Sequence, residues 1–296
     1  MNVQKEPGAG RSAASDIVDE GTIRLIDLAL AEDIGAGDWT TQWTVTARAR
    51  ARAEIIAKAE GTLAGLAAAR AVFHRLDPRI QWESGLDDGA TVKPELVVCR
   101  IKGPARAVLS GERVALNFLQ RLSGIATSTR RFVDAVDGTG ARILDTRKTT
   151  PGWRALEKAA VRAGGGVNHR TGLYDAVLIK ENHIALAGSV AETVARVAEQ
   201  NARKLAVTIE VRSIDELDQA LDAGATRILL DNFELDALRE AVRRRKGRGR
   251  KAPRLEASGN ITLERVRAVA ETGVDEISVG ALTHSATALD FSLRVL

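Results

Sequence analysis

The sequence predicts an α/β protein in which a smaller N-terminal α+β domain precedes an incomplete parallel α/β barrel of about six strands. Two observations predict the barrel. After Gly140, short apolar segments alternate with amphipathic helical segments, and these apolar segments are almost continuously hydrophobic, as in parallel strands buried on both faces. Six such segments fall short of the eight strands of a closed barrel. A third observation, a β-rich pattern with one helix over residues 49–109, predicts the N-terminal domain.

Composition limits the kind of protein this can be. Of the 296 residues, 45% are hydrophobic but only 3% are aromatic, so the core must consist of Ala, Val, Ile and Leu. Cys99 is the only cysteine, which excludes an intramolecular disulfide and suits the reducing cytoplasm, where we expect the protein. Residues 1–15 contain no apolar signal-peptide core, and no run of about 18 apolar residues exists, so we expect no membrane segment.

The elements before Gly140 follow from periodicity and turn signals. We expect residues 1–20 to form a flexible tail, and residues 21–125 to form the N-terminal domain with its linking helix. The linking helix is predicted over residues 111–136, with a break or kink at Ser123-Gly124. The other predicted elements are a helix at Thr22–Ala31, a strand at Ala53–Lys58, a helix at Ala64–Leu76 and a strand at Leu96–Ile101.

Residues 126–280 are predicted to form the barrel domain, and residues 281–296 to return to the N-terminal domain. The predicted barrel strands are Arg142–Asp145, Ala176–Lys180, Ala206–Val211, Thr226–Asp231, Arg254–Ala257 and Glu276–Val279. The helices predicted between them include Val190–Gln200, Ile214–Ala223, Leu235–Arg245 and Leu263–Glu271.

Residue types suited to catalysis or binding follow five of the six barrel strands near their C-terminal ends. A charge at a strand end can simply mark where the strand enters water. Because five strands share the feature, and because active sites of parallel α/β barrels lie at that end, we favour a site. The residues are Arg147 and Lys148, Lys180, Glu210, Asp231, and the run Ser258-Gly259-Asn260, with Gly280 after the sixth strand.

The residue types indicate the kind of ligand. Arg147, Lys180 and the pair His169-Arg170 form a cationic group that suits carboxylates. Glu210 and Asp231 suit ribose hydroxyls or a hydrated Mg²⁺. Glycine turns after the last two strands expose backbone N–H groups at helix starts, where phosphate binds in many barrels. The residues therefore indicate a phosphosugar and a polycarboxylate as ligands.

Seven long motifs in this order resemble the quinolinate phosphoribosyltransferase family, also called nicotinate-nucleotide pyrophosphorylase (carboxylating). The resemblance spans about residues 22–296. The motifs are ALAEDIGAGDWTT, GERVALNFLQRLSGIAT, ILDTRKTTPG, GGGVNHRTGLYDAVLIKENH, ILLDNF, LEASGNIT and ISVGALTHS.

The resemblance implies a fold, a reaction and roles for residues. The fold would be an α/β N-terminal domain joined to an incomplete barrel, in a homodimer. The reaction would join quinolinate to 5-phosphoribosyl-1-pyrophosphate (PRPP) with Mg²⁺ and yield nicotinate mononucleotide, pyrophosphate and CO₂ in NAD synthesis. Quinolinate would be held by Arg147, His169, Arg170 and Lys180, with Arg113 supplied by the partner subunit. PRPP would be held by Lys148, Lys180, Glu210, Asp231, Ser258, Gly259, Asn260 and Gly280, with Mg²⁺ on Glu210 and Asp231 through water. Lys148, Glu210 and Asp231 would be catalytic.

Two alternatives remain open. Thr208 and Arg212 stand where many relatives have acids beside the central glutamate, which concerns the handling of the metal and not the reaction. One alternative is a paralogue of the same fold that uses another aromatic acid, against which the intact Arg147, Arg170 and Lys180 argue. The net charge of +4 comes from the basic tract at residues 243–251, which carries seven positive charges. We favour a solvated loop on the face away from the site over an RNA-binding patch, because aromatic residues for base stacking are not interleaved with the tract.

Overall fold

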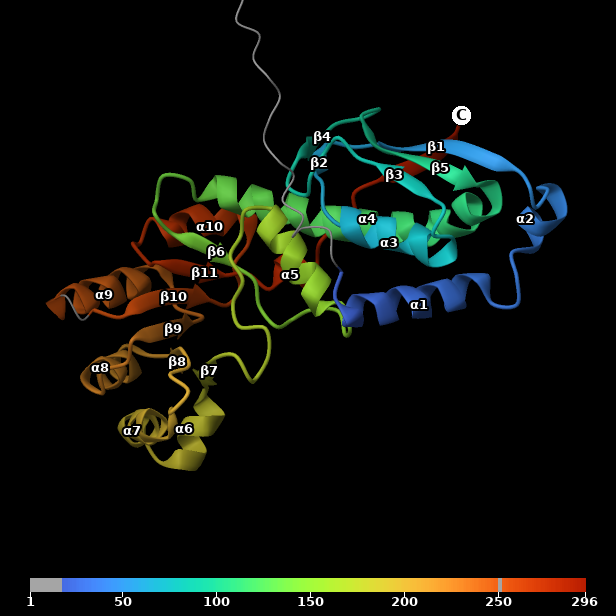
Figure 1. Ribbon diagram of the computed structural model, residues 1–296. Coiled ribbons are helices and arrows are strands. Elements are labelled where there is room, and N and C mark those ends of the chain that lie inside the picture. The colour runs from blue at the N-terminus through green and yellow to red at the C-terminus, as the bar shows by residue number, and fades with distance from the viewer. Residues whose placement is uncertain (1–17, 250–251) are drawn as a thin grey trace, which may run out of the picture.

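A computed structural model describes residues 18–249 and 252–296, which form a β-rich N-terminal lobe and a barrel-like lobe (Figure 1). Each lobe has a hydrophobic core of its own. Most of the tail expected over residues 1–20 lies outside the described residues. The first helix begins at Glu20, where the carboxylate of the capping residue Asp19 accepts a hydrogen bond from the Thr22 N–H.

In the N-terminal lobe, a four-stranded sheet in the order β12-β1-β5-β3 packs against helices α1, α3 and α4 (Figure 1). Every pairing in this sheet is antiparallel, and a short β2-β4 pair lies beside it. The elements are α1 (Glu20–Ile34), α2 (Trp39–Thr44), β1 (Arg50–Ala57), β2 (Gly61–Thr62), α3 (Leu66–Leu76), β3 (Gln81–Glu83), β4 (Thr91–Val92) and β5 (Val97–Pro104). The two strands and two helices predicted here are thus confirmed.

Helix α4 (Ala105–Ala135) connects the two lobes and contributes side chains to both cores. The break expected at Ser123-Gly124 was wrong, because the helix is continuous over 31 residues. The glycine serves close packing instead: a Cβ on Gly124 would lie 2.1 Å from the carbonyl oxygen of Thr287 in the returning C-terminal segment.

The barrel-like lobe contains a six-stranded parallel sheet in the order β6-β11-β10-β9-β8-β7. Strands β6 and β7 are its two edges, so the barrel is open between them. An isolated parallel bridge between Leu144 and Val167 extends the β6 edge into this opening. The strands are β6 (Arg142–Leu144), β7 (Val177–Ile179), β8 (Val207–Val211), β9 (Arg227–Asp231), β10 (Arg254–Ser258) and β11 (Glu276–Ser278). The predicted incomplete barrel and its six strands are confirmed.

Helices pack around the barrel strands, and the chain then crosses back to the first lobe (Figure 1). The helices are α5 (Arg154–Ala163), α6 (Glu181–Ala187), α7 (Val190–Gln200), α8 (Ile214–Asp222), α9 (Leu235–Lys246), α10 (Leu263–Ala270) and α11 (Ala281–His284). Strand β12 (Phe291–Val295) pairs with β1 and places Val295 opposite Ala53. Among the described residues, no helix is both long enough and apolar enough to cross a membrane.

The described part of the basic tract begins in the last turn of α9 rather than in a loop. Its arginines pair with acids of the barrel lobe: Arg244 with Asp218 and Glu240, Arg245 with Asp275, and Arg248 with Asp222. Helix α9 precedes β10 in the chain, so the described part of the tract, residues 243–249, lies toward the end of the barrel opposite the C-terminal ends of the strands. These pairings favour a solvated structural face over an RNA-binding patch.

Candidate functional site

A cavity of about 790 Å³ lies at the C-terminal ends of the barrel strands. Every barrel residue predicted for the site lines it, which confirms that the strand ends converge. Residues not predicted for the site also line it, including Thr146, Leu178, Arg212, Asn232, Glu256, Ser278 and His284. Arg113 is not among the lining residues; it lies exposed on α4.

Two arginines on one flank of the cavity have unsatisfied polar atoms. The Nε atoms of Arg147 and Arg170 are buried and have no hydrogen-bond partner. Arg170 Nη1 donates to the Ala176 carbonyl at 3.2 Å. Burial lowers the pKa of the Arg170 guanidinium, and the neighbouring charge of Arg147 lowers it further. Two partly desolvated like charges are stabilised when an anion binds between them.

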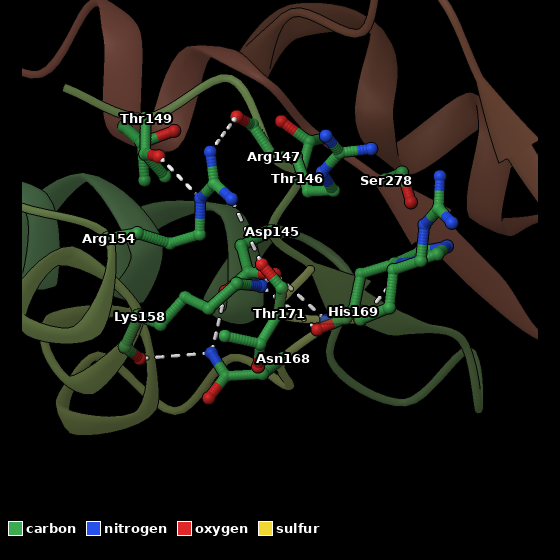
Figure 2. A network of polar contacts seen from close by, with 12 residues as sticks. Asp145, Thr146, Arg147, Thr149, Arg154, Lys158, Asn168, His169, Thr171 and Ser278 are labelled. Carbon is green, nitrogen blue, oxygen red and sulfur yellow. Dashed lines mark hydrogen bonds and ion pairs between the residues drawn. The ribbon is translucent and has the colours of Figure 1, made fainter. Parts of the chain in front are cut away.

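A buried network fixes the loop that carries the second arginine (Figure 2). Asp145, at the end of β6, is fully buried and accepts from Lys158 Nζ at 2.5 Å, Asn168 Nδ2 at 2.6 Å and the His169 N–H at 2.8 Å. Lys158, on α5, also donates to the His169 carbonyl at 2.9 Å. Burial raises the pKa of Asp145, and the Lys158 ammonium opposes that shift. The network therefore holds residues 168–170 against the end of β6.

His169 links this loop to β10 of the barrel. His169 Nδ1 accepts a hydrogen bond from the Arg170 N–H at 2.7 Å. His169 Nε2 lies 3.5 Å from Oε2 of Glu256, on β10. Both ring nitrogens thus face protein atoms, so His169 is a support for Arg170 as well as a residue that lines the cavity.

Two carboxylates lie in the middle of the cavity. Glu210 is the second-last residue of β8, and its Oε2 lies 3.7 Å from the Nζ of Lys180. Burial raises the pKa of Glu210, Lys180 opposes the shift and Asp231 adds to it. Asp231 Oδ2 accepts from the neighbouring Asn232 side chain at 3.0 Å.

The carboxylates fit Mg²⁺ only in combination with a phosphorylated ligand. Among residues 18–249 and 252–296, no group of three or more His, Cys, Asp or Glu side chains is arranged to hold a metal. Mg²⁺ commonly keeps several waters and binds one or two carboxylates together with substrate phosphates. Glu210 and Asp231 could supply the one or two carboxylates of such a site, and the described residues do not form a site in which protein groups alone surround the ion.

The glycine turns have the backbone geometry expected of a phosphate site. Gly259 has φ +94°, and a Cβ there would lie 2.2 Å from Oδ1 of Asn232. Asn232 and Asn260 also have positive φ values, and the Asn260 amide donates to Asn232 Oδ1 at 3.2 Å. Thr262, the N-cap residue of α10, makes no side-chain cap hydrogen bond. Lys148 lies against Gly280, where a Cβ would be 3.2 Å from Lys148 Cδ.

Some lining residues that sequence reasoning missed had a detectable signal. Glu256 interrupts an apolar strand and shares a face with Ser258, because side chains two apart point the same way. Arg212 lies two residues after Glu210, a spacing that places both side chains on the same side of an extended chain, and it pairs with Glu181. His284 Nδ1 lies 2.6 Å from the Ser285 hydroxyl oxygen, and only the fold shows that its ring reaches the cavity.

Comparisons with known proteins agree over both lobes. Residues 38–123 match the family model of the quinolinate phosphoribosyl transferase N-terminal domain, and residues 125–294 match that of the C-terminal domain. A Bacillus subtilis protein named as a nicotinate-nucleotide pyrophosphorylase (carboxylating) is 44% identical over 272 residues, covering 92% of each chain. A Nicotiana tabacum quinolinate phosphoribosyltransferase (decarboxylating) is 43% identical over 290 residues, covering 92% of this chain and 81% of its own.

Solved structures give the same result. The nicotinate-nucleotide pyrophosphorylase from Francisella tularensis superposes with a TM-score of 0.90 at 40% identity, covering 97% of this chain and 100% of that one. The enzyme from Pyrococcus furiosus, at 18% identity and a TM-score of 0.71, shares the fold. The two family matches and the identities over most of the chain lead to one conclusion: this chain belongs to the quinolinate phosphoribosyltransferase family.

Proposed function

We propose that this chain transfers the phosphoribosyl group of PRPP to quinolinate and releases pyrophosphate and CO₂, which yields nicotinate mononucleotide for NAD synthesis. The observation that carries the proposal is one cavity that is lined both by the cations Arg147, Arg170 and Lys180 and by the acids Glu210 and Asp231. The relatives named above carry the same activity in their names. A pyridine with two carboxylates and a charged phosphosugar match the two sides of this cavity.

Quinolinate binds on the cationic flank. Arg147 and Arg170 each have a buried Nε atom without a partner, and each guanidinium can hold a carboxylate through two parallel hydrogen bonds. Lys180 adds a point charge between this flank and Glu210. His169 supports this flank by accepting a hydrogen bond from the Arg170 backbone N–H.

PRPP binds across the rest of the cavity. The 5′-phosphate lies against Ser258, Gly259, Asn260 and Gly280, where the positive φ of Gly259 leaves backbone close to the ligand. Glu210 and Asp231 hold the ribose hydroxyls and, through water, Mg²⁺. Lys148 meets the pyrophosphate. Mg²⁺, when bound with PRPP, neutralises phosphate charge and makes pyrophosphate a better leaving group.

The residues supply charge where the reaction develops it. As the bond from ribose C1 to pyrophosphate breaks, C1 becomes positive and Glu210 and Asp231 stabilise it, while Lys148 stabilises the departing phosphate. The pyridine nitrogen forms the new bond to C1 and becomes positively charged. That charge stabilises the electron pair left on the adjacent ring carbon when its carboxylate departs as CO₂, and a proton then replaces the carboxylate. The arginines must therefore orient quinolinate without binding the ground state more tightly than the transition state in which the carboxylate leaves.

A homodimer completes the site in this proposal, with Arg113 entering from the partner subunit. Arg113 lies on α4, exposed and outside its own cavity. Helix α2, which packs against α4, exposes Trp39 and Trp43, which are 51% and 79% accessible and have ring centroids 5.8 Å apart. A pair of exposed tryptophans is typical of a protein interface, and α4 presents the exposed Arg113 on the helix that α2 contacts. We also propose a cytoplasmic location, which fits a single, buried, unpaired Cys99.

The experiment that tests the proposal supplies the purified protein with PRPP, Mg²⁺ and either quinolinate or nicotinate. Quinolinate should give nicotinate mononucleotide with an equal amount of CO₂. Nicotinate should give little product, because it lacks the second carboxylate that Arg147 and Arg170 share. Turnover of nicotinate, or of another aromatic acid, at a rate above that of quinolinate would support the paralogue and refute the proposal.

A further inference from the structure

A buried glutamate in the floor of the cavity has no role in the reaction described above. Glu256 lies in the middle of β10, is 1% accessible and lines the cavity. Its Oε1 accepts a hydrogen bond from the Ser278 hydroxyl on the neighbouring strand β11. Its Oε2 is buried and has no hydrogen-bond partner. A desolvated carboxylate oxygen without a donor costs free energy, so its retention at the cavity needs a reason.

The atoms nearest this oxygen are on His169 and Arg227. His169 Nε2 lies 3.5 Å away, and Arg227 Nη2 lies 3.9 Å away; Arg227 is the first residue of β9 and does not line the cavity. Arg227 pairs more closely with Glu276. The polar group left to engage Glu256 Oε2 on the cavity side is therefore the imidazole of His169.

The hydrogen bond at the other nitrogen of that imidazole shows which tautomer is present. His169 Nδ1 accepts a hydrogen bond from the Arg170 N–H at 2.7 Å, so it carries no proton. The proton of the neutral ring is then on Nε2, which faces Glu256. The ring thus bridges Glu256 in the barrel to the backbone of Arg170 on the loop.

We propose that Glu256 is a positioning residue for the substrate carboxylate site, acting through His169 on Arg170. The His169 Nε2–H faces Glu256 Oε2 at 3.5 Å, and the attraction between them holds the ring with Nδ1 unprotonated toward the backbone N–H of Arg170. The arginine that binds the carboxylate is thereby fixed from two directions: by Glu256 through the ring and by Asp145 through the His169 N–H. Ser278 orients the carboxylate by occupying Oε1. This inference rests on the assignment of quinolinate to the cationic flank.

The first test compares two buried glutamates at the same level of the sheet. Glu256 and Glu276 are paired in register on adjacent strands and are each 1% accessible, but Glu276 does not line the cavity and instead contacts Arg142, Arg227 and Arg254. We expect Glu256→Met to raise the KM for quinolinate by on the order of tenfold, with the KM for PRPP changed less than about twofold. Glu276→Met, or Glu276→Gln if the former does not fold, should leave the KM for quinolinate unchanged. Equal effects on quinolinate from both positions would overturn the proposal.

The conservative variant Glu256→Gln separates positioning from packing. Its amide oxygen can accept from His169 while its NH₂ group donates to Ser278, so most of the affinity for quinolinate should return. A Gln variant as weak as Glu256→Met would overturn the claim that a hydrogen-bond acceptor is what this position supplies.

A double-mutant cycle tests whether Glu256 acts through His169. In the His169→Ala background, adding Glu256→Met should change the KM for quinolinate by less than about twofold, because the connection is already lost. Independent effects that multiply would contradict the proposed route through the imidazole.

A measurement without substrate keeps this inference distinct from the proposed function. Nitrogen NMR of the His169 ring should show the proton on Nε2 in the wild-type protein and a mixture of tautomers in Glu256→Met. An unchanged tautomer in Glu256→Met would overturn the inference whatever the substrate is. Conversely, if Arg170→Ala leaves quinolinate binding intact while the tautomer shifts as expected, the site assignment fails and the positioning contact stands.

Discussion

Arg170 is held by its neighbours and still lacks a partner for its Nε atom. Its Nη1 donates to a backbone carbonyl, while the buried Nε remains unsatisfied. Burial and Arg147 together lower its pKa, which means that the charged form is destabilised until an anion arrives. Such a group suits the carboxylate-binding role that we propose for Arg170.

We expect Arg170→Ala to raise the KM for quinolinate by about 10- to 100-fold, the range for losing hydrogen bonds to a charged group. The KM for PRPP should change little, because Arg170 is not among the residues to which we assign PRPP. Steady-state kinetics with each substrate varied in turn makes the measurement. Arg239→Ala, on the exposed face of α9, is the control and should behave as wild type. Wild-type affinity for quinolinate in Arg170→Ala would refute the assignment.

The pH dependence of the reaction should report on Glu210. Its pKa is raised by burial, so the carboxylate needed to stabilise C1 forms at a higher pH than for an exposed glutamate, and activity should rise with pH through that value. Lys180 lowers this pKa and Asp231 raises it. The acid limb of kcat/KM for PRPP should therefore move to higher pH in Lys180→Ala and to lower pH in Asp231→Asn. Shifts in the same direction in both variants would show that another group controls the limb.

Among individual residues, those at the strand ends could be predicted from the sequence, because parallel strands bring their C-terminal ends to one edge of the sheet. It did not predict Asn232 or Glu256. Asn232 acts through a positive φ and a contact with Asn260, which depend on two neighbouring strands at once. The role of Glu256 depends on its contact with His169, which lies 87 positions earlier in the chain. Periodicity within one strand does not reveal such a partner.

Among the elements, β6, α5 and the loop at residues 168–170 are joined by the Asp145–Lys158 pair. The two side chains are 0% and 3% accessible and 2.5 Å apart. Removing one member of a buried pair leaves the other charge uncompensated, which is far costlier than breaking an exposed pair.

We therefore expect Lys158→Met to lower the free energy of unfolding by about 3–5 kcal/mol. The loss of its bond to the His169 carbonyl should also loosen the loop and weaken quinolinate binding. Denaturant unfolding monitored by circular dichroism gives the stability. Arg24→Met is the comparison, because Arg24 and Glu20 are 74% and 82% accessible, and it should cost less than about 1 kcal/mol. A similar small cost for Lys158→Met would contradict the view that this pair supports the loop.

The elements themselves were largely predictable from periodicity, and the one clear error is instructive. A Ser-Gly pair inside a helical pattern suggested a break, yet α4 continues through Gly124. The glycine is required by the approach of Thr287, some 160 residues later in the chain, and a contact over that separation leaves no mark in the local pattern.

At the scale of the whole molecule, the site as proposed is incomplete in one subunit. Arg113 is exposed and absent from the lining of its own cavity, and it lies on α4, the helix that contacts α2 with its exposed tryptophans. Dimerisation is therefore expected to be required for full affinity for quinolinate.

Mixed dimers test which subunit supplies Arg113. Arg113→Ala and Arg170→Ala should each be weak alone at low quinolinate. A purified heterodimer of the two contains one site with its own Arg170 and the partner's intact Arg113, so it should recover about half of the wild-type rate. If Arg113 served its own subunit, both sites of the heterodimer would be defective, and no recovery would be seen.

The central claim is that quinolinate and PRPP meet in the cavity at the C-terminal ends of the barrel strands. A crystal structure with quinolinate and an unreactive PRPP analogue tests it most directly. We predict quinolinate carboxylate oxygens about 2.7–2.9 Å from the guanidinium nitrogens of Arg147 and Arg170, and ribose hydroxyls on Glu210 and Asp231. Quinolinate bound outside this cavity, or with its carboxylates away from both arginines, would contradict the account.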